Sequence, residues 1–164
     1  MFLKNCWYVA AWDHELIDGK MLARTILEEA VLLYQSESGK VVALQDRCCH
    51  RGVPLHLGRR EGDCVRCMYH GLKFDARGQC VEAPGIEIVP ARARVRRYPV
   101  AVRNRWVFVW MGDPAGADEA LLRFDNFLSG LPAGIQLFSL LGNNPALLDL
   151  MVRILAAAPR LAEI

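Results

Sequence analysis

Two short Cys/His pairs constrain this chain more than any other feature of its sequence. The pairs have the spacings C-x-H and C-x-x-H, and sixteen residues separate them. They consist of Cys48, His50, Cys67 and His70. Each pair is followed closely by a glycine, Gly52 or Gly71, which lets the loop backbone pass close to a bound group. The chain must therefore fold so that two loops meet around one metal centre.

This spacing resembles the ligand set of a Rieske [2Fe-2S] centre, in which two His replace two Cys on one iron. The resemblance implies that Cys48 and Cys67, as thiolates, bind the inner iron, and that neutral His50 and His70 bind the outer iron. Because imidazole donates less electron density than thiolate, the reduction potential rises to between roughly −150 and +300 mV. Such a cluster relays electrons and does not itself transform a substrate.

The same four residues have a second interpretation. Two Cys and two His could hold a structural Zn²⁺ tetrahedrally, which would make the chain a non-redox interaction module. Iron and sulfide analysis, or the colour of the protein, separates the two alternatives. The sequence around the pairs favours iron.

Longer stretches resemble the N-terminal domain of Rieske non-haem iron aromatic oxygenases, and most of all the vanillate O-demethylase type. The matching stretches are residues 5–10, 46–55, 69–75 and 106–114. The family usually has Pro where this chain has Cys49, which is not a ligand position. The resemblance implies a mainly β fold, a Rieske-type antiparallel β sandwich with a small cluster-binding subdomain whose ligand loops are hairpin tips.

A comparison with respiratory Rieske proteins narrows the subclass. Those proteins join their two ligand loops by a disulfide, and the corresponding positions here are Val53 and Tyr69. No such disulfide can form. The chain is therefore expected in the oxygenase or ferredoxin branch, with a potential toward the low end of the Rieske range.

Short apolar runs separated by turn residues predict the strands of the β domain. The expected strands are residues 7–11, 21–27, 30–35, 41–45, 64–67, 73–75, 95–102 and 106–111. Residues 36–39 and 76–79 have the composition of hairpin turns, and residues 61–63 should turn the chain between the two ligand loops.

Near residue 118 the sequence changes from short strand-like apolar runs to apolar residues at helical spacing. This change predicts a Rieske domain at 1–117 and a short all-α tail at 118–164. Apolar residues recur at helical spacing over 118–128, 133–141 and 145–157. From about residue 123 the tail resembles a helical piece of the glutamine synthetase adenylyltransferase family. No nucleotidyltransferase residues can be placed there, so the tail is either a native linker or a fused segment.

An oxygen-activating iron site is not expected in these residues. Such a site needs two His and a carboxylate, whereas the chain has four His, two of which belong to the proposed cluster. The others are His14, expected on the surface, and His56, expected to be solvated or to support the ligands. The D-x-x-H-x₄₋₅-H motif of the oxygenase family is absent. We expect an oxidoreductase component that does not oxygenate substrate alone.

The family resemblance implies a flavin and iron–sulfur reductase as electron donor and an oxygenase catalytic domain or subunit as acceptor. The net charge of +2 gives no indication of nucleic-acid binding, and no apolar run is long enough to span a membrane. The first six residues lack the apolar core of a signal peptide, which favours the cytoplasm. The remaining cysteines are expected to be small buried hydrophobes: Cys6, Cys49, Cys64 and Cys80.

Overall fold

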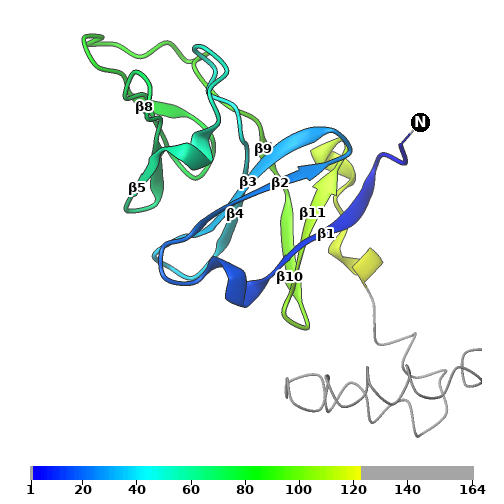
Figure 1. Cartoon of the computed structure of the whole chain (residues 1–164). Coiled ribbons are helices and arrows are strands. Elements are labelled where there is room, and N and C mark those ends of the chain that lie inside the picture. The colour runs from blue at the N-terminus through cyan, green and yellow to red at the C-terminus, as the bar shows by residue number, and fades with distance from the viewer. Residues whose placement is uncertain (1, 123–164) are drawn as a thin grey trace, which may run out of the picture. The chain divides into compact units, whose positions relative to one another are not determined.

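The computed structural model describes residues 2–122, which form three antiparallel β-sheets (Figure 1). The first sheet has the order β1-β11-β10, with β1 at Cys6–Trp12, β11 at Trp106–Met111 and β10 at Val100–Arg103. The second has the order β2-β3-β4-β9, at Met21–Ile26, Glu29–Gln35, Val41–Gln45 and Arg97–Tyr98. The third has the order β5-β6-β7-β8, at Arg59–Glu61, Cys64–Arg66, Lys73–Phe74 and Cys80–Glu82.

Short 3₁₀ helices accompany the strands in this part of the chain. They are η1 at Asp13–Leu16, η2 at Leu55–Leu57, η3 at Pro114–Gly116 and η4 at Glu119–Leu122. None of the helices within residues 2–122 is long and apolar enough to cross a membrane. Apart from residues 120–122, the described residues belong to one compact unit, Met1–Glu119.

Strand β3 lies at the centre of the fold because both of its faces are buried. Successive side chains of a strand point to opposite faces of the sheet. Val31 and Leu33 pack against the first sheet, whereas Leu32 and Tyr34 pack toward the third sheet. All four are fully buried. The second sheet therefore serves two cores, and Figure 1 shows it between β1, β10 and β11 on one side and β5 and β8 on the other.

The predicted β sandwich with a separate small subdomain is confirmed. The sandwich is formed by the first two sheets, and the third sheet is the subdomain that carries the second Cys/His pair. The expected turns at 36–39, 61–63 and 76–79 each join two antiparallel neighbours. Strands β5 and β8 were not predicted, because each has only three residues and half-exposed charged positions.

One expected strand, 95–102, is wrong as a single element. The structure has β9 and β10 there, separated by Pro99. Proline has no backbone N–H to donate and so interrupts a ladder. At this point the chain also changes sheets, since β9 pairs with β4 and β10 pairs with β11.

The helices expected at 133–141 and 145–157 lie outside the described residues. Of the helix expected at 118–128, only the first turn is described, as η4.

Candidate metal centre

The first ligand loop joins two different sheets. It leaves β4 at Gln45 and reaches β5 through η2, so it is not the tip of a β-hairpin as expected. Its backbone turns tightly. The Cys48 N–H donates to the Val53 carbonyl at 2.8 Å, and the Gly52 N–H donates to the Cys48 carbonyl at 2.9 Å. Gly52 has φ of +74°, a left-handed conformation that favours glycine.

The second ligand loop repeats this pattern between β6 and β7, and here it is a hairpin tip. The Cys67 N–H donates to the Leu72 carbonyl at 2.8 Å, and the Gly71 N–H donates to the Cys67 carbonyl at 3.2 Å. Gly71 also has φ of +74°. In both loops, a Gly in the left-handed conformation lies four residues after the Cys. The N–H of that Cys donates to the carbonyl of the residue directly after the Gly. This shared pattern explains why a glycine follows each Cys/His pair.

All four predicted ligands come together. The residues that line one small hollow between the loops include Cys48, His50, Cys67 and His70. Both cysteines are 3% exposed, whereas both histidines are exposed. The imidazole rings of His50 and His70 lie edge to face with centroids 4.7 Å apart. Two thiols therefore lie on the inner side of the hollow and two imidazoles on its outer side.

Burial changes the acidity of Cys48. It raises the pKa of the Cys48 thiol to about 11, although a hydrogen bond from the backbone N–H of His50 to the sulfur opposes the change. The neighbouring Cys67 thiol adds to the rise. Each thiol must lose its proton to bind a metal, since the thiolate is the ligand form.

The donor set suits a two-iron cluster. A Rieske cluster takes two protein ligands at each of two irons, one pair of thiolates and one pair of imidazoles. The two buried cysteines and the two adjacent exposed imidazoles around this hollow are such a set.

The two sides of the hollow have different surroundings. The cysteines belong to a core cluster that includes Leu55, Val65 and Phe74, all fully buried. The histidines line a neighbouring cavity of about 650 Å³, which has largely apolar walls and contains Arg92. A metal group in the hollow would therefore be shielded on the sulfur side and accessible on the histidine side.

The other four cysteines were expected to be small buried hydrophobic residues, and the structure only partly matches this expectation. Cys80 is buried and Cys6 and Cys64 are half-buried, but Cys49 is exposed, so it is not a core residue. It directly follows the proposed ligand Cys48 on the first ligand loop. All six cysteines are free thiols in the structure.

Two polar arrangements beside the ligand loops were not predicted. Asp46 is 4% exposed and holds His56 by both carboxylate oxygens. Arg66 binds two carboxylates and the carbonyl of Gly71. Neither could be found from sequence spacing, because the partners are brought together by the turn of the loops and by strand register.

The fold and the paired donors define a small β iron–sulfur domain. The Rieske [2Fe-2S] domain family matches residues 6–99, and the chain belongs to this family. The chain is therefore expected to carry the family's [2Fe-2S] cluster.

Relatives with curated descriptions include oxygenase components. The toluene-4-sulfonate monooxygenase system iron-sulfur subunit TsaM1 of Comamonas testosteroni is 59% identical over 118 residues, which cover 72% of this chain and 34% of that protein. The vanillate O-demethylase oxygenase subunit of a Pseudomonas species is 41% identical over 123 residues, covering 74% and 34%. The chain spans about a third of the length of these relatives.

A solved structure shows the same architecture. The crystal structure of dicamba monooxygenase superimposes with a TM-score of 0.69 at 45% sequence identity, over 73% of this chain and 38% of that one. The similarity confirms the predicted resemblance to Rieske oxygenases in fold as well as in sequence.

A separate match concerns the glutamine synthetase adenylyltransferase resemblance. The bifunctional glutamine synthetase adenylyltransferase/adenylyl-removing enzyme of Agrobacterium fabrum is 81% identical over 53 residues, which are 32% of this chain and 5% of that enzyme. So short a part of a large enzyme carries no activity over to this chain.

Proposed function

We propose that Cys48, His50, Cys67 and His70 hold a Rieske [2Fe-2S] cluster and that this chain relays electrons in an oxygenase system. The observation that carries the proposal is the pairing of two buried thiols with two exposed imidazoles around one hollow, on two loops with the same backbone pattern. When bound, the cluster supplies a centre that takes up and releases one electron at a time.

The chain's own residues prepare this site. Cys48 and Cys67 release their thiol protons as they bind iron, and their burial keeps them away from solvent oxidants. His50 and His70 face outward, so their ring edges provide the shortest path for electrons to a docked partner. Leu55, Val65 and Phe74 exclude water from the opposite side.

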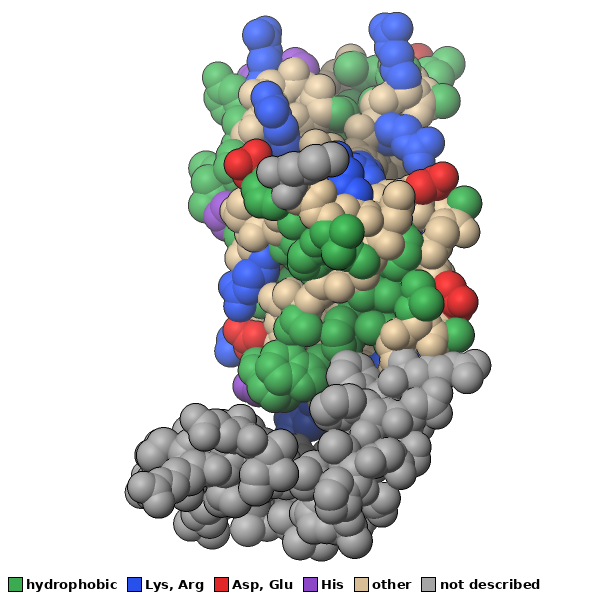
Figure 2. Space-filling view, turned by 90° about the vertical axis from the view of Figure 1, so that its right-hand side faces the viewer, with side chains coloured by type: hydrophobic (Ala, Val, Ile, Leu, Met, Phe, Trp, Pro, Cys, Tyr) green, Lys and Arg blue, Asp and Glu red, His purple; other side chains and the backbone are tan. Residues whose placement is uncertain are grey.

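The donor we propose is a flavin and iron–sulfur reductase. Exposed arginines near the histidine ligands support an acidic partner, and they include Arg47, Arg51, Arg92 and Arg94. Within the described residues, Figure 2 shows Lys and Arg side chains at the end where β8 lies in Figure 1. Complementary charge of this kind speeds association at low salt. A nicotinamide-dependent reductase also favours the cytoplasm as the place of action.

The acceptor we propose is a mononuclear iron in an oxygenase catalytic domain or subunit beyond these residues. Of the two histidines outside the proposed cluster, His56 is bonded to Asp46 and His14 lies beside Asp13. The proposal that the second iron lies elsewhere is supported by the sequence, in which these two histidines lack the D-x-x-H-x₄₋₅-H context of the oxygenase iron site. We accordingly assign residues 1–117 to the Rieske domain and 118–164 to a separate tail.

Electron transfer without oxygenation tests this proposal. With NADH and a vanillate-demethylase-type reductase, the purified chain should be reduced and should pass electrons to an artificial acceptor such as cytochrome c. Oxygen uptake with vanillate should stay at the level of the reductase alone. A chain that accepts no electrons, or that forms demethylated product by itself, would reject the proposal.

A further inference from the structure

A row of cationic side chains crosses the small sheet directly below the second ligand loop. Register places Arg59 opposite Arg66, Arg66 opposite Lys73 and Lys73 opposite Glu82. Directly paired residues point to the same face, and like charges in such pairs repel each other. Three neighbouring cations therefore need compensation. Glu61 provides it, because its carboxylate forms ion pairs with all three.

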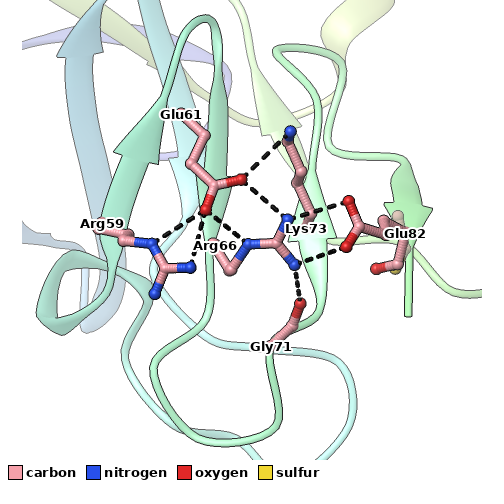
Figure 3. A network of polar contacts seen from close by, with 7 residues as sticks. Arg59, Glu61, Arg66, Gly71, Lys73 and Glu82 are labelled. Atoms are coloured by element: carbon pink, nitrogen blue, oxygen red, sulfur yellow. Dashed lines mark hydrogen bonds and ion pairs between the residues drawn. The ribbon is translucent and has the colours of Figure 1, made fainter. Parts of the chain in front are cut away.

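Arg66 is the centre of this network (Figure 3). Its Nε and Nη2 donate to the two oxygens of Glu61 at 2.7 and 2.8 Å. Its Nη1 and Nη2 donate to the two oxygens of Glu82, both at 2.9 Å. A fifth bond runs from Nη1 to the Gly71 carbonyl at 2.7 Å. A guanidinium has five N–H donors, so each has an acceptor here, and no lysine could replace this planar fork.

The bond to Gly71 connects this network to the metal centre. Arg66 immediately precedes the ligand Cys67, and Gly71 immediately follows the ligand His70. The side chain of Arg66 thus reaches over the loop and holds its far end. The Arg66 side chain is only 13% exposed, and its bonds to Glu61 and Gly71 are partly buried, whereas its bonds to Glu82 are exposed to water. Arg59 reaches the same Glu61 but is 68% exposed and does not contact the loop.

We propose that Arg66 is a positioning residue that closes the second ligand loop and keeps Cys67 and His70 in their binding geometry. Two backbone hydrogen bonds close this loop at Cys67, and the bond from Arg66 adds a side-chain restraint at Gly71. The role in cluster binding rests on the proposed ligand set, whereas the closing of the loop does not. The side chain of Arg66 bonds to Glu61, Glu82 and the Gly71 carbonyl, so it acts on the proposed ligands through the backbone of Gly71.

The test compares Arg66→Met with the matched control Arg59→Met in the full chain. Both changes remove one arginine that binds Glu61, but only Arg66 reaches the loop. Hydrogen exchange by mass spectrometry is followed in peptides spanning 67–72 and 48–53. Release of iron to a chelator is followed in parallel. Circular dichroism checks folding. Arg66→Lys, which keeps the positive charge but not the planar guanidinium, is the second variant if Arg66→Met does not fold.

We expect exchange in 67–72 to become about ten-fold faster in Arg66→Met, with no change in 48–53, and iron release to accelerate by about ten-fold or more. Arg66→Lys should show the same selectivity, and Arg59→Met should stay within about two-fold of wild type. Unchanged exchange in 67–72 or an unchanged release rate in folded Arg66 variants would overturn the inference, as would an equal effect of Arg59→Met. Wild-type protein without iron and sulfide would instead reject the proposed ligand set, and the exchange measurement would still decide whether Arg66 closes the loop.

Discussion

His56 and Asp46 join the two ends of the first ligand loop. The backbone N–H of His56 donates to Asp46 Oδ1 at 2.8 Å, and His56 Nδ1 lies 2.5 Å from Asp46 Oδ2. Asp46 is itself anchored to the second sheet, since its N–H donates to the Ala30 carbonyl at 2.9 Å. The segment between the two residues contains both Cys48 and His50. His56 therefore supports the loop and is not among the residues lining the hollow.

Replacing His56 by Ala should leave the visible spectrum and the iron content unchanged. The protein should lose about 1–3 kcal/mol in free energy of unfolding, because one oxygen of the buried Asp46 carboxylate loses its partner. Denaturant unfolding with iron analysis measures both. His14→Ala is the control, since His14 is 55% exposed and its loss should change stability little. A folded but colourless His56→Ala protein would mean that the ligand assignment is wrong.

The Glu61 carboxylate should make stability depend on pH in acid. Hydrogen bonds from Arg66 are the main reason that the pKa of Glu61 is lowered from 4.5 to about 2. A carboxylate with a lower pKa in the folded than in the unfolded chain stabilises the fold fully above its unfolded pKa. That contribution is lost as the pH falls through the folded pKa.

The wild type should therefore unfold less readily than Glu61→Gln by a constant margin above about pH 5, and the margin should shrink from there toward about pH 2. Urea unfolding of both proteins at several pH values measures it. Glu87→Gln, at an exposed position, is the control. A margin that stays constant or grows in acid would contradict the role given to Glu61.

The reduction potential should be that of the oxygenase branch. Val53 and Tyr69 occupy the positions that carry the disulfide in respiratory Rieske proteins. We expect a potential at neutral pH between roughly −150 and 0 mV. Protein-film voltammetry at neutral pH tests this, and a potential well above zero would place the domain in the respiratory branch.

The candidate ligands and most of the β elements could be predicted from the sequence because they depend on local signals. The Ser36 to Gly39 turn and the continuous apolar run of β3 mark their elements without knowledge of the rest of the chain. The candidate site could also be predicted from local sequence, since each Cys/His pair lies within one loop. The left-handed backbone at Gly52 and Gly71 explains why each Cys/His pair is followed by a glycine.

The supporting residues could not be read in this way. Glu61, Arg66 and Glu82 belong to three strands, and only the register of the small sheet brings them together. Strand β5 was missed for the same reason, because Arg59–Glu61 becomes a strand only through pairing with β6. Cys49 is exposed although its neighbour Cys48 is buried, and residue spacing alone does not reveal which of the two faces solvent.

The most direct measurement is the iron and acid-labile sulfide content of the purified chain, combined with electron paramagnetic resonance of the reduced protein. We predict about two irons and two sulfides per chain and a low-g signal of the Rieske type with nitrogen coupling from His50 and His70. Cys48→Ser and Cys67→Ser should abolish all of these, whereas Cys49→Ser, at the exposed neighbouring position, should retain them. Zinc without sulfide, or a cluster that survives in Cys48→Ser, would contradict the assignment.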